Sequence, residues 1–232
     1  MESGRVSDFI KGYIPDGSEE LRVLRDKAEK NGVPIIRKET EAFLVSVLML
    51  KKPERILELG TATGYSAMLM ARTMERYAFN RTAERDTGIA NGKLSDASID
   101  TIEDWEPRFI EAKTNIEKAC MADMINLIQG DALQIMKELD GSYDFIFIDA
   151  AKGQYPDYLD ETIRLTHEGS VIIADNIFQD GEIMESKYIV KRRDRTIHKR
   201  MREFLDNVSS DDRLTTSILP VGDGITFSVR IR

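Results

Sequence analysis

The chain has 232 residues, of which 41% are hydrophobic and 32% are charged, and its formal net charge is -8. This length and composition are typical of one soluble α/β domain, so we expect a single domain over residues 1–232. The negative net charge argues against a protein that coats nucleic acid with its whole surface, although it allows one local basic face.

Signals for a membrane or an extracellular location are missing from the sequence. No apolar run approaches the roughly 20 residues of a membrane span, and the N-terminus lacks the apolar core of a signal peptide. The only cysteine, Cys120, has no partner for a disulfide within the chain. We therefore expect a cytoplasmic protein.

The first 50 residues have the pattern of a helical N-terminal layer. Apolar residues recur at three-to-four spacing, as in Leu21, Leu24 and Ala28. The pattern predicts helices over residues 9–13, 19–30 and 39–50.

The spacing of apolar residues changes from residue 55 onward. Continuous apolar runs, separated by helical stretches, are typical of buried parallel strands. We expect such strands at 56–59, 98–103, 125–128, 145–148 and 171–174. At the far end, two more strands flank a Pro-Val-Gly-Asp-Gly turn at 220–224, which predicts a closing antiparallel hairpin over 214–219 and 225–231.

One segment interrupts this order. Residues 77–97 contain several Gly, Asn and Ser residues and little apolar periodicity, so we interpret them as a surface insertion.

A glycine turn follows the first predicted strand: Glu58-Leu-Gly60-Thr-Ala-Thr-Gly64. It has two glycines and a preceding acid, unlike the G-x-G-x-x-G fingerprint of dinucleotide sites. An acid at the mouth of the turn suits a ligand with a cationic amino group, and S-adenosylmethionine has one and carries no phosphate. A glycine turn can also serve packing alone, so both interpretations stay open.

Two acids at the ends of the following strands are candidates for cofactor contacts. Glu103 has the character of a ribose-binding acid, placed later than usual by the insertion, but it could also be an ordinary acid at a helix start. Asp131 could accept a hydrogen bond from an adenine amino group, and it could equally cap a helix.

Hard oxygen ligands end the next two predicted strands. Asp149, Asp175 and Asn176 offer two carboxylates and an amide, which suit magnesium or calcium rather than zinc. The alternative is that the Asp175-Asn176 pair caps a loop. Since the carboxyl ends of neighbouring strands converge in a doubly wound sheet, these groups and the glycine turn would share one crevice.

Lys152 is the candidate general base, because a lysine near a divalent ion can have its pKa lowered. A solvated loop lysine is the alternative. The two histidines, His167 and His198, are not near the strand ends in sequence, and no G-x-S-x-G nucleophile elbow is present.

Taken together, these motifs resemble the metal-dependent class I O-methyltransferases, a family that includes catechol and caffeoyl-coenzyme A O-methyltransferases. The resemblance implies a doubly wound, mostly parallel, seven-stranded α/β sheet of the Rossmann-like type, and commonly a homodimer. It implies a magnesium-type site at Asp149, Asp175 and Asn176 and a base at Lys152. It also implies an S-adenosylmethionine site formed by Glu58, Gly60, Tyr65, Ser66, Glu103, Asp131, Ala132 and Asp149.

The sequence departs from any family pattern at Asp104-Trp105. Trp105 could stack on adenine, but we expect it to be a core aromatic.

Within the family, the segment 149–155 and the closing turn look most like the bacterial tRNA 5-hydroxyuridine methyltransferases. A basic stretch over 187–202, expected to be helical, could contact RNA phosphates, although a charge run is often only a solvated helix face. Its candidate RNA-binding residues are Arg192, Arg193, Arg195 and Lys199.

Three functions therefore remain open. The first is methylation of 5-hydroxyuridine in tRNA, and the second is methylation of a small catechol or phenol. Both acceptors present two adjacent oxygens, so the catalytic residues cannot distinguish them. The third is a non-catalytic nucleotide- or RNA-binding module.

Overall fold

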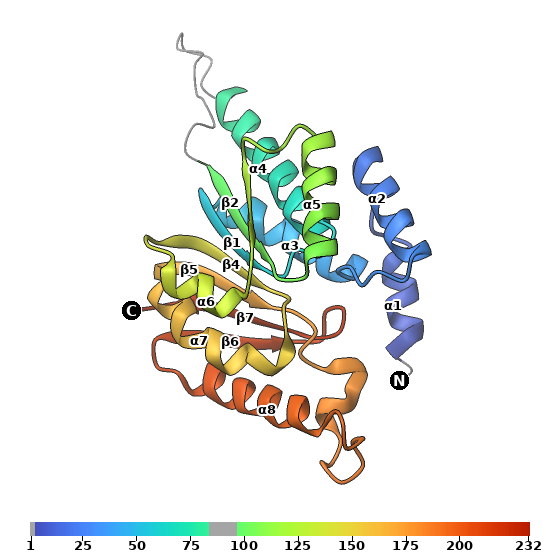
Figure 1. Ribbon diagram of the computed structural model, residues 1–232, viewed down its shortest axis with the longest axis vertical. Helices are drawn as coiled ribbons and strands as arrows, with labels where there is room; N and C mark the ends of the chain where they lie inside the picture. The colour runs from blue at the N-terminus through green and yellow to red at the C-terminus, as the bar shows by residue number, and fades with distance from the viewer. Residues whose placement is uncertain (1–2, 84–96) are drawn as a thin grey trace.

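A computed structural model describes residues 3–83 and 97–232, and they contain one seven-stranded sheet with the strand order β3-β2-β1-β4-β5-β7-β6 (Figure 1). Strands β1 to β5 pair in parallel, and β7 pairs antiparallel with both β5 and β6. The predicted doubly wound sheet with a closing hairpin is confirmed. The strands are β1 (Arg55–Leu59), β2 (Ser98–Glu103), β3 (Ile125–Gln129), β4 (Tyr143–Ile148), β5 (Thr166–Ala174), β6 (Leu214–Leu219) and β7 (Ile225–Arg230).

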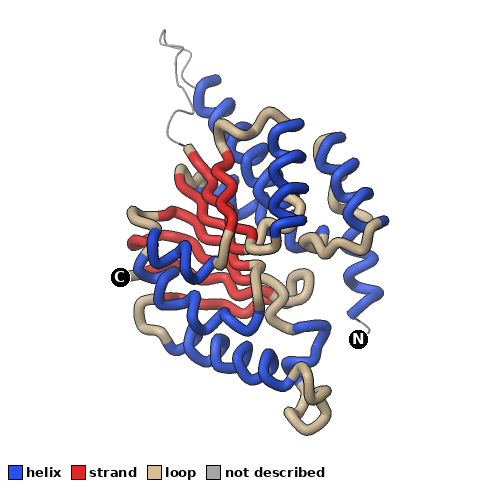
Figure 2. The backbone as a smooth tube through the Cα atoms, in the orientation of Figure 1, coloured by secondary structure: helices blue, strands red, loops and turns tan. Residues whose placement is uncertain are grey.

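Helices cover both faces of this sheet (Figure 2). The apolar side chains of α2 to α5 form one core layer with the sheet, and those of α6 to α8 form the other. Successive side chains of β1 point to opposite faces of the sheet, so Ile56 packs in the first core layer and Leu57 in the second. The helices are α1 (Ser3–Lys11), α2 (Glu19–Lys30), α3 (Lys38–Lys51), α4 (Tyr65–Ala83), α5 (Glu106–Lys118), α6 (Ala132–Glu138), α7 (Tyr155–Arg164) and α8 (Arg195–Ser210), with 3-10 turns η1 (Lys152–Gln154) and η2 (Gln179–Met184).

The N-terminal helices are joined to α4 by a buried polar contact. The Arg25 guanidinium donates to the Glu41 carboxylate at 2.5 Å and to the Tyr65 hydroxyl at 3.2 Å. Tyr65 in turn donates to Glu41 at 2.8 Å. Because all three groups are satisfied together, the network can be buried and fixes how the N-terminal layer sits on the sheet.

Two predicted boundaries differ from the structure. The first helix runs from Ser3 to Lys11 rather than over 9–13. Residues 77–83 of the expected insertion continue helix α4, because the Tyr77 side chain is buried and its hydroxyl donates to the Pro53 carbonyl. Residues 84–96 lie outside the described residues.

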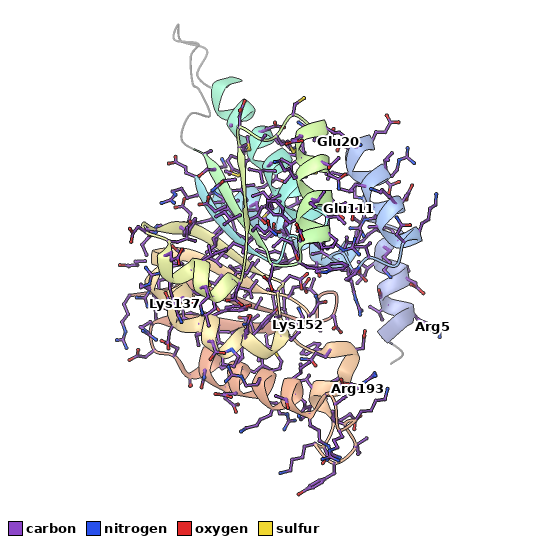
Figure 3. The ribbon with its side chains drawn as sticks, viewed as in Figure 1. Arg5, Glu20, Glu111, Lys137, Lys152 and Arg193 are labelled. Carbon is purple, nitrogen blue, oxygen red and sulfur yellow. The ribbon has the colours of Figure 1, made fainter. Side chains whose placement is uncertain are left out.

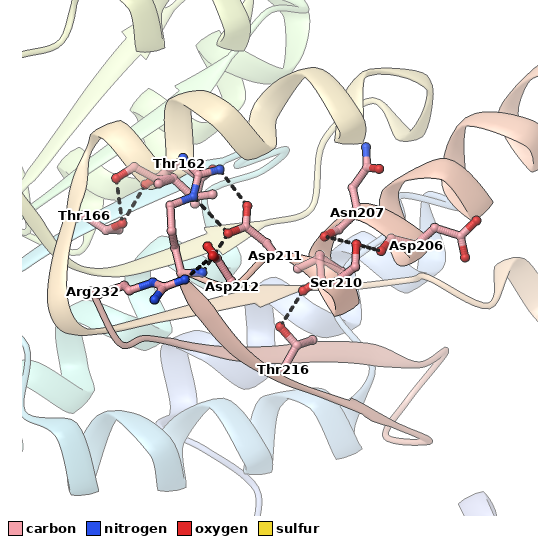
Figure 4. A network of polar contacts seen from close by, with 12 residues as sticks. Thr162, Thr166, Asp206, Asn207, Ser210, Asp211, Asp212, Thr216 and Arg232 are labelled. Carbon is pink, nitrogen blue, oxygen red and sulfur yellow. Dashed lines mark hydrogen bonds and ion pairs between the residues drawn. The ribbon is translucent and has the colours of Figure 1, made fainter.

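Polar contacts at the end of the sheet remote from its glycine turn hold the C-terminal strands (Figure 4). The Thr166 hydroxyl donates to the Thr162 carbonyl at 2.8 Å, and Arg232 forms an ion pair with Asp212. These contacts fasten α7 to β5 and the chain end to the turn before β6. Within the described residues, no helix is long and apolar enough to cross a membrane.

Candidate active site

A cleft of about 670 Å³ opens where β1 to β5 end at their carboxyl edge. Five chain segments that follow these strands contribute to its wall, as expected for a doubly wound sheet. Of the predicted site residues, the cleft is lined by Gly60, Glu103, Asp131, Ala132, Asp149, Lys152 and Asn176. Glu58, Tyr65, Ser66 and Asp175 are buried, and they are not among its lining residues.

Gly60 allows two strand ends to approach closely. Its φ is +90°, and a Cβ at this position would lie 2.3 Å from the Asp149 carbonyl oxygen. Only glycine tolerates both conditions. The glycine turn therefore brings the ends of β1 and β4 together at the cleft floor.

Glu103 and Asp131, at the ends of β2 and β3, both line the cleft, and each accepts hydrogen bonds from backbone amides. Glu103 accepts hydrogen bonds from the Ala62 amide at 2.9 Å and from the Trp105 amide at 3.0 Å. Asp131 caps α6 by accepting from the Gln134 amide at 3.0 Å, so the helix-cap alternative is confirmed. This cap and a bond from Gln154 lower the Asp131 pKa, so the residue carries a negative charge at the cleft.

Glu58 is fully buried beneath the glycine turn. Burial raises its pKa to about 7, against the opposing effect of the Ser66 and Thr101 hydroxyls. Thr101 donates to Glu58 Oε2 at 2.5 Å. Glu58 is thus an acid without a cationic partner among the described residues, in a place where a cationic group would relieve its desolvation.

The three predicted metal ligands meet at the ends of β4 and β5. Asn176 Nδ2 donates to Asp149 Oδ1 at 2.8 Å, and the Asn176 backbone amide donates to Asp175 Oδ1 at 2.7 Å. The described residues contain no group of three His, Cys, Asp or Glu side chains arranged to hold a metal. Any cation here would therefore depend on the amide oxygen of Asn176 as its third protein ligand.

Asp175 supplies the physical test of whether a cation fits. Its Oδ2 atom is buried and has no hydrogen-bond partner. Burial, and then the negative charge of Asp149, raise the Asp175 pKa to about 7. An unsatisfied carboxylate oxygen beside a second carboxylate and an amide is the donor set that a hard divalent cation prefers, so the residues fit such an ion.

Lys152 lies at the centre of this site (Figure 3). Its ammonium donates to Asp149 Oδ1 and to the Tyr155 hydroxyl, each at 2.8 Å, and to the Asp175 carbonyl at 3.3 Å. Burial alone would lower the Lys152 pKa, but the nearby Tyr155 and Asp149 groups outweigh it and raise that pKa. In this arrangement the lysine holds its proton, so it can act as a base only if another charge changes its surroundings.

Trp105 is not a core aromatic, so that prediction is wrong. Its side chain is 58% exposed and lines the cleft, with the Arg108 guanidinium 5.4 Å from the ring centroid. The turn after β2 turns the indole outward before α5 begins. Trp105 stands between charged residues, and this local sequence did not indicate whether its side chain would be buried in the core or exposed in the cleft.

Several residues that line the cleft were not predicted as site residues from the sequence. Gln154 donates to Asp131 at 3.1 Å and accepts from the Tyr158 hydroxyl at 2.6 Å. Four further lining residues are Arg37, Gln179, Asp180 and Asp223. The turn at 220–224 was interpreted as a hairpin turn and as part of the family resemblance, but no site role was predicted for Asp223.

The basic stretch over 187–202 is helical only from Arg195. Arg195 is partly engaged, since it donates to the Val190 carbonyl at 3.1 Å. Arg200 and Arg202 bind the carbonyls of Gly153 and Ile183. Lys187, Lys191, Arg192, Arg193 and Lys199 are exposed on the preceding loop and the first helical turn, where Figure 3 shows Arg193.

Comparison with known proteins shows the family of the chain. The O-methyltransferase family matches residues 88–231. The chain is 30% identical to a catechol O-methyltransferase of Niastella koreensis, over 78% of this chain and 74% of that protein. It is 28% identical to a caffeoyl-CoA O-methyltransferase of Stellaria longipes, over 100% of this chain and 92% of that protein.

A solved structure has the same fold. The O-methyltransferase of Bacillus cereus, in complex with SAH, superposes with a TM-score of 0.78 at 23% identity and covers 97% of both chains. A parallel sheet with a glycine turn and an acid at its carboxyl edge defines a class of enzymes that bind nucleoside cofactors. The chain belongs to the O-methyltransferase family within this class.

Proposed function

We propose that the chain is an S-adenosylmethionine-dependent O-methyltransferase that uses a divalent cation and acts on an acceptor with two adjacent oxygens. The observation that carries this proposal is the Oδ2 atom of Asp175, which is buried and has no hydrogen-bond partner. Asp175 lies beside Asp149, Asn176 and Lys152, three residues that line the cleft. Membership in an enzyme family favours this function over a non-catalytic binding module.

S-adenosylmethionine is the proposed methyl donor. Glu103 and Asp131 would bind the ribose and the adenine amino group, and Trp105 offers an aromatic face in the same cleft. Gly60 and Ala132 would leave room for the ligand, while Glu58 precedes the glycine turn and Tyr65 and Ser66 follow it. The relatives of known structure include one in complex with SAM, TomG from Streptomyces achromogenes.

Asp149, Asp175 and Asn176 would hold the cation. Its chemical contribution would be to lower the pKa of the acceptor hydroxyl and to neutralise the two buried carboxylates. A positive charge there would also weaken the hold of Asp149 on the Lys152 ammonium, which favours the neutral amine that a base requires.

Lys152 would take the proton of the acceptor hydroxyl. S-adenosylmethionine would supply the methyl group: the acceptor oxygen would bond to the methyl carbon as the carbon–sulfur bonding pair returned to sulfur. S-adenosylhomocysteine would be the by-product, and Nζ of Lys152 would hold the proton until it passed to solvent. Tyr155, which accepts a bond from Nζ, would orient the lysine.

The acceptor we favour is 5-hydroxyuridine in tRNA, where the ring hydroxyl and its neighbouring carbonyl supply the two oxygens. The support is the exposed basic loop, defined as residues 184–193. It carries Lys187, Lys191, Arg192 and Arg193, together with the exposed Tyr188. Cations beside an aromatic ring suit a nucleic acid on an otherwise acidic protein.

A small catechol is the second candidate acceptor. The observation in its favour is the 30% identity to a relative named as a catechol O-methyltransferase. The cleft volume of about 670 Å³ also fits a small molecule together with the methyl donor. A homodimer and a cytoplasmic location remain predictions from the sequence.

The decisive experiment is transfer of a labelled methyl group from S-adenosylmethionine to tRNA carrying 5-hydroxyuridine and, in parallel, to catechol. Each reaction is run with Mg²⁺ and with EDTA. Chelator-sensitive labelling of tRNA alone is the expected result. Labelling of catechol alone would refute the tRNA acceptor, and labelling that persists in EDTA would refute the cation.

A further inference from the structure

Gln179 is a cleft residue that the proposed chemistry leaves without a role. It follows Asn176 by three residues and lines the same cleft as Asp149 and Lys152. Its carboxamide presents one acceptor oxygen and two N–H donors, with no charge. Such a group can recognise a polar ring by hydrogen bonds but cannot act as a general base.

The backbone on both sides of Gln179 is held by the turn at 220–224. The Phe178 amide donates to the Asp223 carbonyl at 2.9 Å, and the Asp180 amide donates to both oxygens of the Asp223 carboxylate, at 2.9 and 3.1 Å. Asp180 also accepts a bond of 2.6 Å from Arg37. The turn at 220–224 and Arg37 thus fix the position from which the Gln179 side chain extends.

This position is conformationally costly for its residues. Gln179 and Asp180 have φ values of 49° and 53°, in the left-handed region that non-glycine residues seldom adopt. Consecutive residues of this kind persist only where the surrounding structure enforces them, and they cluster at binding sites. The bonds to Asp223 provide that enforcement here.

The Gln179 amide has an unused hydrogen-bonding group. Its Nε2 atom is buried and has no partner among the described residues. The other two carboxamides of the cleft are engaged, since Asn176 Nδ2 donates to Asp149 and Gln154 Nε2 donates to Asp131. An acceptor on a ligand in the cleft could satisfy this donor.

We infer that Gln179 is a specificity-determining residue that reads the N–H and carbonyl edge of a uracil-type acceptor ring. The inference rests on the proposed function and deepens it. In 5-hydroxyuridine the N3–H donor and the O4 acceptor lie side by side, and a carboxamide can match both with Oε1 and Nε2. A catechol bound in the same way keeps an oxygen at the position of O4 but presents a C–H group in place of the N3–H donor.

The test compares Gln179→Met with the wild type on both acceptors. Methionine has a similar length and no amide, so the cleft stays filled while both hydrogen bonds are lost. The matched control is Gln129→Met, because Gln129 is an exposed glutamine on the edge strand β3 and does not line the cleft. Thermal unfolding and S-adenosylmethionine binding are measured for each variant. These measurements show whether the fold and the proposed S-adenosylmethionine site are intact.

We expect Gln179→Met to lower kcat/KM for 5-hydroxyuridine tRNA by about 10- to 100-fold, the range for loss of a two-bond contact to a base edge. Catechol methylation should fall less, because a catechol can form only one of the two bonds, and the Gln129→Met control should change by less than about 3-fold. A tRNA activity that is unchanged, or that falls in step with catechol activity, would overturn the inference. A wild-type protein that methylates neither acceptor would instead refute the proposed function on which it rests.

Discussion

The ammonium group of Lys152 donates a hydrogen bond of 2.8 Å to Oδ1 of Asp149. The lysine thereby supplies the positive charge next to a carboxylate that we propose as a cation ligand. An ammonium and a divalent ion beside the same carboxylate repel each other, so the two compete for it. Lysine protonation and cation binding should therefore be linked at this site.

Replacing Lys152 by methionine tests this link. Methyl transfer should fall by about 100- to 10,000-fold, the usual contribution of a general base, while the affinity for Mg²⁺ should rise because the competing charge is gone. Isothermal titration with Mg²⁺ and the labelled methyl assay measure the two effects. Lys118→Met, at an exposed position on α5, is the control. Weaker Mg²⁺ binding by Lys152→Met would contradict the competition.

Asp175→Asn should abolish cation binding without unfolding the protein. The variant keeps the side-chain size but removes a buried carboxylate whose pKa is raised to about 7. At pH 8 in EDTA it should unfold at a higher temperature than the wild type, since it has no buried charge to desolvate. Mg²⁺ should raise the unfolding temperature of the wild type and not that of the variant.

Asp212→Asn is the matched control for this substitution. Asp212 is exposed and pairs with Arg232 at the chain end, away from the cleft. This variant should keep the full Mg²⁺-dependent stabilisation. If Asp175→Asn also keeps it, the proposed cation site is wrong.

Most of the sheet could be predicted from the sequence because buried parallel strands carry their signal locally. The predicted strands over 98–103 and 214–219 coincide with β2 and β6, and every other predicted strand overlaps the observed one. The strand ends also located Glu103, Asp149 and Asn176, since topology alone brings the carboxyl edge together. This half of the cleft follows from chain order and strand direction.

The other half could not be predicted, because tertiary contacts between remote segments create it. Asp223 reaches the cleft wall where it binds the Asp180 amide, and Arg37 reaches it where it forms ion pairs with Asp180 and Asp223. No periodicity in the sequence encodes these pairs. The raised pKa of Lys152 depends instead on local conformation, because Asp149 and Tyr155, each three residues away, both contact its ammonium group.

Gly60→Ala should severely destabilise the fold. The added Cβ would lie 2.3 Å from the Asp149 carbonyl oxygen, at a φ of +90°. Relief requires β1 and β4 to separate, so we expect a loss of more than about 2 kcal/mol in urea unfolding. Gly153→Ala is the control, because no heavy atom lies within 4 Å of the Cβ it adds. Equal stabilities for the two variants would contradict the proposed role of Gly60.

Glu58 should make the stability of the cofactor-free protein depend on pH. Burial raises its folded-state pKa to about 7, above the unfolded value of 4.5. The folded state therefore binds the proton more tightly, and its stability falls as the pH rises from 4.5 through 7, by up to about 3 kcal/mol. Glu58→Gln lacks this titration.

Urea unfolding at pH 5 and pH 8 measures the effect as a difference between wild type and Glu58→Gln. The wild type should lose more stability than the variant between these two pH values. S-adenosylmethionine, through its cationic amino group, should reduce that difference if it binds near Glu58. A variant that shows the same pH dependence as the wild type would assign the titration to other groups.

The exposed basic loop should contribute to tRNA binding through charge. Arg192 has no ion pair among the described residues, and Arg193 contacts only Asp194, at 3.3 Å. If both bind phosphates, Arg192→Ala combined with Arg193→Ala should weaken tRNA binding and reduce the salt dependence of log Kd by about 2. Filter binding between 50 and 200 mM salt, roughly the range over which phosphate contacts are lost, measures both quantities. Lys113→Ala combined with Lys118→Ala, on the exposed side of α5, removes the same charge elsewhere and should leave the slope unchanged. A matching loss in both double variants would mean that net charge, and not this loop, governs the binding.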